Sequence, residues 1–324
     1  MTSPESLRVV AFKSMSALPL LAAQQRSYFS KRGLSVDIEF ASQSLALRRG
    51  LVTGTYDIAQ TAADNAVAMV ENDGTDVVIV TGGDNGFNSF IIQDGLRELA
   101  DFRGRALVVD APDTGFALVA YQILKNAGLA PGGYAIKPVG SSELRLWELH
   151  QDPANGGAIL GLPFSLQAVA GGLRKAGNAV DFIGPYLSSA TFVRRAWLRD
   201  HADTLVRYIA AHIEGLRWLL SPESKDEVVA LISSSLAVPA DQADESYRQA
   251  LNGFSPDAEI DREGFEEVLR LRSEFGSLAG KKLGPIEKYL DLACWTLART
   301  DLDGTSKKLS RNDRTNQVQH HSEQ

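Results

Sequence analysis

The sequence predicts an α/β protein of two lobes with a helical C-terminal return, and three observations lead to this prediction. Apolar strands and helical patterns alternate through a first block that ends near Asn88. The alternation starts again at Phe90 and continues to Lys175. After Asp203 the spacing of apolar residues is helical only. Alternation of this kind is typical of mostly parallel sheets that helices cover on both faces.

The first block is predicted to begin with a short buried strand at Leu7–Phe12. Helical spacing follows over Ala17–Gly33, and the terminal glycine is suited to a C-cap. The remaining elements keep the alternation. They are strands at Val36–Phe40, Tyr56–Gln60 and Asp76–Val80, and helices at Ser44–Leu51 and Asp64–Val70.

The second block repeats this architecture and leads into the helical return. Its predicted strands are Phe90–Gln93, Ala106–Val109, Tyr134–Val139 and Ala158–Leu162. Its predicted helices are Thr114–Asn126, Ser142–His150 and Leu166–Lys175. Two further strands follow, at Phe182–Ile183 and Thr191–Arg195. The helices of the return are Thr204–Leu220, Lys225–Leu236, Gln242–Asn252, Arg262–Glu274 and Ile286–Leu297.

The helices of the return have no strands of their own, so they must pack on a sheet that already exists. We therefore expect a discontinuous lobe one, residues 1–88 plus 189–300, and a lobe two at 89–188. Residues 301–324 carry aliphatic side chains only at Leu302, Leu309 and Val318. Such a segment cannot bury enough apolar surface to offset its ordering entropy, and a disordered tail is predicted.

Composition excludes several classes of function. With 33 Lys+Arg against 40 Asp+Glu and a net charge of -7, the chain lacks a basic field, and no nucleic-acid partner is expected. Its single cysteine, Cys294, excludes an intramolecular disulfide and a multi-cysteine metal site. No apolar run approaches the roughly 20 residues of a membrane-spanning helix, so no span is expected.

The sequence also shows none of the common arrangements of catalytic residues. His150, His201 and His212 fall at or within predicted helices, away from the loops where doubly wound folds place their chemistry. A serine or cysteine nucleophile therefore has no obvious base. The glycines of 82–86 follow a strand but lack the G-x-G-x-x-G spacing, which favours a simple turn. We expect no catalytic residue, no metal site and no cofactor.

Small polar loops follow five predicted strands. Ligands of open α/β sheets bind at the carboxyl ends of the strands, where helix N-termini present free N–H groups. Five such loops in two lobes predict a cleft, although single members such as Asp64, Asp113 and Thr114 are also good helix caps. The loops are residues 13–16, 60–65, 81–88, 110–115 and 162–165.

Four segments carry a resemblance to a known family. They are Leu96–Ala117, Leu124–Leu129, Tyr28–Asp37 and Arg49–Ala59. In order and spacing they resemble the type 2 periplasmic substrate-binding proteins for nitrate, sulfonates and taurine, together with their thiamine-pyrimidine-synthesis relatives. The resemblance implies two α/β lobes that close around a small-molecule ligand, with crossovers near Phe87–Phe90 and Tyr186–Ala190. It also implies a periplasmic location and, as partners, the membrane permease and ATPase of an ABC importer.

Carried over by position, the resemblance gives ten candidate ligand-binding residues. They are Ser14, Met15, Thr61, Asp64, Gly83, Asn85, Asp113, Thr114, Pro163 and Phe164. Nitrate and sulfonate binders usually have a Gly-Ser-rich turn where this chain has Pro112–Gly115. A carboxylate at Asp113, with Asp64 and Asp84 nearby, would repel an anion. Among nitrogen- or sulfur-containing compounds, we therefore expect an amine-bearing or neutral ligand.

Two other functions remain open at this point. One is an enzyme on the same scaffold, either desulfinase-like or similar to the pyrimidine-synthesis relatives, which use a lysine for a pyridoxal cofactor. Lys13 is the candidate for such a lysine, against the ordinary alternative of a solvated side chain. The other is a cytoplasmic ligand sensor, because residues 1–8 lack the features of a secretory leader.

Overall fold

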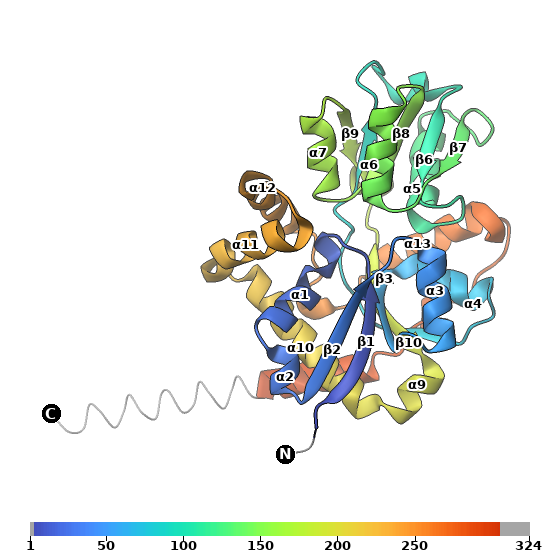
Figure 1. Cartoon of the computed structure of the whole chain (residues 1–324). Coiled ribbons are helices and arrows are strands. Elements are labelled where there is room, and N and C mark those ends of the chain that lie inside the picture. Colours follow the sequence, from blue (N-terminus) through green and yellow to red (C-terminus); the bar gives the residue numbers. More distant parts are fainter. Residues whose placement is uncertain (1–2, 305–324) are drawn as a thin grey trace.

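The computed structural model describes residues 3–304 and contains two five-stranded sheets with helices around them (Figure 1). In the first sheet the strand order is β2-β1-β3-β10-β4, and β10 alone runs antiparallel to its neighbours. Its strands are β1 (Glu5–Ala11), β2 (Leu34–Phe40), β3 (Ile58–Ala62), β4 (Val77–Thr81) and β10 (Ser189–Arg194). We call this sheet with its helices lobe one.

The second sheet has the order β7-β6-β8-β5-β9, and here β5 is the antiparallel strand. Its strands are β5 (Ser89–Ile92), β6 (Ala106–Val109), β7 (Ala135–Pro138), β8 (Asn155–Leu160) and β9 (Arg174–Asn178). Its helices are α5 (Gly115–Asn126), α6 (Ser142–Gln151), α7 (Phe164–Ala170) and α8 (Ala179–Ile183). This is lobe two, and the α/β class predicted from the sequence is confirmed.

Lobe one carries most of the remaining helices, and α1 packs along α10 in its core. They are α1 (Leu18–Gln25), α2 (Tyr28–Lys31), α3 (Ser44–Thr53), α4 (Ala63–Glu71), α9 (Arg195–Asp200), α10 (Ala202–Leu220), α11 (Lys225–Leu236) and α12 (Ala240–Ala250). The helix α13 (Arg262–Glu274) contacts both α4 of lobe one and α5 of lobe two. No helix among residues 3–304 is long and apolar enough to cross a membrane.

Short 3-10 helices join several of these elements. They are η1 (Met15–Ala17), η2 (Leu99–Phe102), η3 (Pro222–Ser224), η4 (Pro256–Ala258), η5 (Gly276–Leu278) and η6 (Ile286–Lys288). A last helix starts at residue 293 and is followed to residue 304. Residues 301–304 of the predicted tail are thus helical, and the rest of that tail, 305–324, lies outside the described residues.

Four predicted elements differ from the structure. The helix predicted over Ala17–Gly33 is broken into α1 and α2, because Ser27 takes a left-handed conformation with φ of 60°. The helix predicted over Leu166–Lys175 stops at Ala170, and β9 follows it. The strand predicted at Phe182–Ile183 is the end of α8, which a capping box between Asn178 and Asp181 starts. The helix predicted over residues 286–297 is interrupted between η6 and residue 293.

Two crossover segments connect the lobes, residues 82–88 and 184–188. The backbone oxygen of Asp84 accepts hydrogen bonds from the amides of Ser188 and Ser189, at 2.9 and 3.2 Å, so the crossovers are tied together. The buried carboxylate of Asp84 also accepts from the Ser189 hydroxyl at 2.5 Å and the Gly86 amide at 2.6 Å. Burial raises the pKa of this carboxyl group, against the lowering effect of those hydrogen bonds. The predicted residue boundaries of the two lobes stay a prediction.

Candidate ligand-binding site

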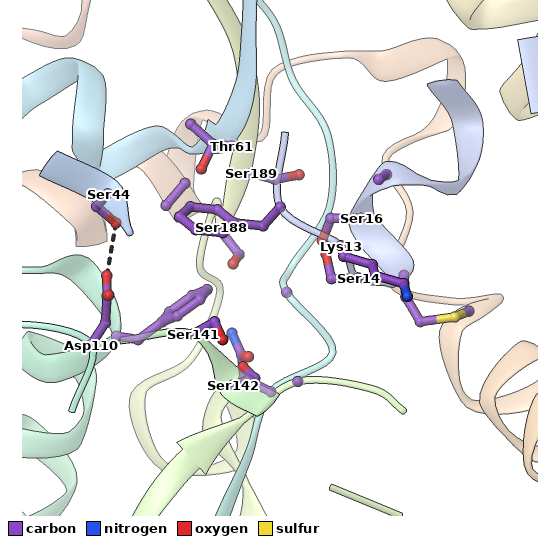
Figure 2. A pocket seen from close by; sticks show the side chains of 18 of the residues that line it. Lys13, Ser14, Ser16, Ser44, Thr61, Asp110, Ser141, Ser142, Ser188 and Ser189 are labelled. Atoms are coloured by element: carbon purple, nitrogen blue, oxygen red, sulfur yellow. Dashed lines mark hydrogen bonds between the residues drawn. The ribbon is translucent and has the colours of Figure 1, made fainter. Parts of the chain in front are cut away.

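A cavity of about 280 Å³ lies between the two lobes, at the carboxyl ends of strands from both sheets (Figure 2). All five loops singled out from the sequence contribute lining residues. The segment after β1 supplies Lys13–Ala17, and the region around the start of α4 supplies Thr61 and Asn65. From lobe two come Asp110, which follows β6, and Gly161, Leu162 and Phe164, which follow β8. Strand ends of open α/β sheets are the usual place for a ligand.

Five of the ten candidate residues line this cavity: Ser14, Met15, Thr61, Thr114 and Phe164. Figure 2 shows Thr61 across the cavity from Ser141 and Ser142. The hydroxyl oxygen of Thr61 is buried and has no hydrogen-bond partner among the described residues. A buried polar atom without a partner is costly, and a ligand could supply the missing hydrogen bond. Contact between these residues and a ligand stays a prediction.

Asp64 and Asp113 are not among the residues that line the cavity, and their contact with a ligand stays a prediction. Both carboxylates bind Arg272 of α13, whose side chain is fully buried. Its guanidinium reaches Asp64 at 2.6 Å and Asp113 at 2.9 Å. Asp113 also accepts hydrogen bonds from the amide and the hydroxyl of Ser277. Both carboxylates are therefore paired with Arg272 outside the lining of the cavity, and this one guanidinium offsets one of their two negative charges.

The pKa values agree with this description. Burial raises the pKa of Asp113, but the Ser277 hydrogen bonds and the charge of Arg272 outweigh it and hold the pKa below its ordinary value. Burial lowers the pKa of Arg272, and the neighbouring charges of Asp64 and Asp113 more than reverse that effect. Arg272 stays charged, so the cluster has two carboxylates and one guanidinium.

The other three candidates also lie outside the lining of the cavity. Gly83 and Asn85 pair through their backbones with Ser255 and Gly253, in the segment that follows α12. The side-chain oxygen of Asn85 accepts from the amide of Phe87, which closes a local turn. Pro163 immediately precedes α7. These residues shape the crossover and a helix start instead of facing the cavity.

Sequence reasoning missed three segments that contribute lining residues, within positions 40–44, 141–145 and 188–189. The segment Ser141–Arg145 follows β7 and begins α6, so it is a strand-to-helix loop like the five that were singled out. Its two serines were a usable signal. With these two, eight serines line the cavity. These are Ser14, Ser16, Ser42, Ser44, Ser141, Ser142, Ser188 and Ser189.

Arg145 is the most unusual of the missed residues. It is only 3% exposed, and its guanidinium donates to the Ser142 hydroxyl at 2.8 Å. Its Nε has no hydrogen-bond partner, and no carboxylate of the described residues lies within 4.0 Å of it. Burial lowers the pKa of Arg145 to about 10, while the charge of Asp110 acts in the opposite direction. The cavity wall thus contains a buried cation without an ion pair.

Asp110 joins the two lobes at one side of the cavity. Its Oδ2 accepts a hydrogen bond of 2.7 Å from the hydroxyl of Ser44, at the start of α3 in lobe one (Figure 2). Near this contact, Gly140 of lobe two lies close to the backbone of Ser42. The lobes therefore touch across the cleft, and the cavity is covered on this side.

Four helices of nine or more residues begin at the cavity, namely α3, α4, α5 and α6. The free N–H groups and the dipole of a helix N-terminus favour negatively charged groups. Of the described histidines and Cys294, none lines the cavity, whereas the exposed Lys13 does. No group of three or more His, Cys, Asp or Glu side chains suited to a metal occurs within residues 3–304.

Two α/β lobes, two crossovers and a cavity between opposing strand ends define the periplasmic-binding-protein fold of type 2. The family model described as NMT1/THI5 like matches residues 14–224, which is more than half of the chain. The chain belongs to this family. A comparison with curated protein sequences gave no match.

Solved structures support the fold. The periplasmic nitrate-binding protein NrtA from Synechocystis PCC 6803 is 16% identical, with a TM-score of 0.79 over 92% of this chain and 89% of its own. The aliphatic sulphonate binding protein SsuA from Escherichia coli is 15% identical, with a TM-score of 0.70 over 89% and 98%. The desulfurization enzyme DSZB is 13% identical, with a TM-score of 0.66 over 92% and 99%. These likenesses confirm the predicted fold, and the match to the family model confirms the resemblance predicted from the sequence.

Proposed function

We propose that this protein is the ligand-binding component of an ABC-type import system for a nitrogen- or sulfur-containing organic compound. Its partners would be a membrane permease and an ATPase, and it would work in the periplasm. The supporting observation is the cavity between two lobes, with side chains of both lobes around it. Its volume of about 280 Å³ suits a small molecule. The ligand-binding component of an ABC-type import system from Staphylococcus aureus shares the fold, as do the periplasmic binding proteins NrtA and SsuA.

An enzyme on this scaffold is not favoured by the site. DSZB has the same fold and is an enzyme, so the fold alone does not decide between binding and catalysis. The lining of the cavity contains neither histidine nor cysteine, and Lys13 is exposed rather than desolvated. A lysine needs desolvation or a neighbouring cation to act as a nucleophile near neutral pH. Reversible binding is therefore the activity that these side chains support.

Two of the acidic residues behind the expectation of an amine-bearing or neutral ligand are paired with Arg272 and do not line the cavity. Asp64 and Asp113 were expected to make the cleft repel anions, but Arg272 binds both. The third, Asp84, lies in the crossover and does not line the cavity. The charges that do face the cavity are therefore the ones that decide the choice of ligand.

The test is a ligand screen on the full chain by thermal shift, followed by isothermal titration. A ligand that binds only the folded state raises the melting temperature in a concentration-dependent way. We expect saturable one-to-one binding by at least one organic nitrogen or sulfur compound, and recovery of that compound unchanged. Chemical conversion of the bound compound, or absence of any saturable binder in a broad library, would contradict the proposal.

A further inference from the structure

The cavity wall carries two opposite charges that do not pair with each other. Asp110 follows β6 and Arg145 lies in α6, so both belong to lobe two. The charge of Asp110 acts on Arg145, yet the two groups form no ion pair within 4.0 Å. Side chains that could pair but remain apart leave room for a molecule that contacts both.

Arg145 is placed to bind an acidic group of a ligand. A buried guanidinium without a carboxylate is costly, because burial removes water and nothing replaces it. The hydroxyl of Ser142 compensates only one of its N–H groups. Arg145 lies in the first turns of α6, whose N-terminus adds further attraction for a negative group. An acidic group of a ligand would satisfy the guanidinium and the helix end together.

Asp110 is placed to accept a hydrogen bond from a donor of the ligand. One carboxylate oxygen accepts from Ser44, and no described residue donates to the other oxygen, Oδ1. The charged residues that line the cavity are Lys13, Arg145, Asp110 and Glu143. Two of these are basic and two acidic, so their formal charges cancel. A lining with zero net charge favours a ligand that is neutral overall but carries both signs.

We propose that the cavity takes a zwitterion whose acidic group binds Arg145 and whose protonated amine binds Asp110. The inference rests on the proposed function and names the substrate class of the same site. Five phenylalanines also line the cavity, so an apolar part of the ligand can pack against them. These are Phe12, Phe40, Phe87, Phe116 and Phe164. Amino carboxylates and aminosulfonates both have this chemistry, and the experiment separates them.

The experiment uses matched triplets of probes and four variants of the full chain. One triplet is L-phenylalanine, 3-phenylpropanoate and 2-phenylethylamine, and the other is taurine, ethanesulfonate and ethylamine. The test variants are Arg145→Met and Asp110→Asn. Arg103→Met and Asp94→Asn serve as controls, since both residues are exposed in lobe two and lie outside the cavity. Affinities come from isothermal titration, and a melting curve verifies that each variant is folded.

We expect the zwitterion of at least one triplet to bind more tightly than its lone acid and its lone amine. Each test variant should weaken it roughly 10- to 100-fold, as the loss of a charge-assisted hydrogen bond implies, and the controls should not. Asp110→Asn should in addition reduce the preference for the zwitterion over the acid. The triplet that binds identifies a carboxylate or a sulfonate as the acidic group.

Three results would overturn the inference. They are a lone acid or amine that binds as tightly as the zwitterion, an affinity that neither test variant changes, and the failure of both zwitterions to bind. If other organic compounds from the ligand screen bind while the zwitterions do not, only this inference fails. If no organic compound binds at all, the proposed function fails as well.

Discussion

Arg145 combines a cost to the folded protein with an expected benefit to binding. Without ligand, its guanidinium is buried and has no carboxylate partner. Replacing even a buried ion pair by apolar side chains of similar volume is often neutral or stabilising, by about 1–4 kcal/mol, and an unpaired buried ion lacks the attraction that a pair has. Arg145→Met should therefore raise the free energy of unfolding of the ligand-free protein, measured by urea denaturation. A clear loss of stability, with Arg103→Met unchanged, would show that Arg145 has a structural partner instead.

Asp84 allows a prediction about pH. Because burial raises the pKa of its carboxyl group above 3.8, the folded protein keeps a proton that the unfolded chain has already lost above that pH. The stability that depends on this proton falls as the pH rises from about 4 through the folded pKa. The variant Asp84→Asn has no carboxyl group to lose a proton at this position, so its stability does not fall for this reason. We expect the unfolding free energy of the variant, minus that of the native protein, to increase with pH across this window.

The measurement is urea denaturation of both proteins at a series of pH values. Asp94→Asn is the control, because Asp94 is an exposed aspartate. The difference in unfolding free energy between Asp94→Asn and the native protein should stay constant over the same pH range. A flat or falling difference for Asp84→Asn would contradict the assigned protonation of this residue.

At the scale of single residues, the sequence could place the loops but not the orientation of their side chains. Ser14, Thr61 and Thr114 line the cavity. Asp64 does not, because its partner Arg272 lies 208 positions further along the chain and only the tertiary fold brings the two together. Arg145 escaped notice for the opposite reason, since an arginine in a helical pattern looks like a solvated surface residue.

Among the elements, α13 connects the lobes behind the cavity. Its Arg272 binds Asp64 of lobe one and Asp113 of lobe two. Removing one partner of a buried ion pair leaves an uncompensated charge and typically costs 3–5 kcal/mol. Arg272→Met should therefore reduce the unfolding free energy by about that amount. The double variant with Asp64→Asn should lose less than the sum of the two single changes, because the same interaction would otherwise be counted twice.

A matched control for α13 is Arg262→Met in its first turn. Arg262 pairs with Glu287, and both side chains are more than half exposed. Exposed pairs contribute about 0–1 kcal/mol, so little change is expected there. Equal effects of Arg262→Met and Arg272→Met would contradict the importance given to the buried cluster.

The elements that the sequence predicted well are those with strong apolar patterns, such as β4 and α10. The strand β9 was missed because Arg174–Asn178 contains no β-branched or aromatic residue. It is a strand only because it pairs with β5 at the edge of the second sheet. The short helix α8 was mistaken for a strand through Phe182 and Ile183, whose apolar pair outweighed the capping signal before it.

For the whole molecule, the bond between Ser44 and Asp110 suggests how closure and binding are linked. It crosses from lobe one to lobe two and is available only when the lobes are together. A hydrogen bond to a charged group contributes about 1.5–3 kcal/mol. Ser44→Ala should therefore speed ligand dissociation by roughly tenfold or more and leave association nearly unchanged, as stopped-flow fluorescence can measure.

Ser234→Ala is a suitable control, because Ser234 is exposed on α11 and lies outside the cavity. Small-angle scattering gives a second readout. The radius of gyration of the native protein should decrease when ligand is added, and Ser44→Ala should need more ligand for the same decrease. If dissociation is unchanged in Ser44→Ala, the contact between the lobes does not hold the ligand in place.

The position of β10 has a consequence for how the protein is made on the ribosome. In the first sheet, β10 lies between β3 and β4, so these two strands do not pair with each other. A nascent chain that ends before Ser189 can already contain every strand of the second sheet, yet β4 still lacks its neighbour. Unpaired strand edges are open to wrong partners. Although it begins first, the N-terminal sheet can be completed only after the second, and β4 needs protection from aggregation while lobe two is being translated.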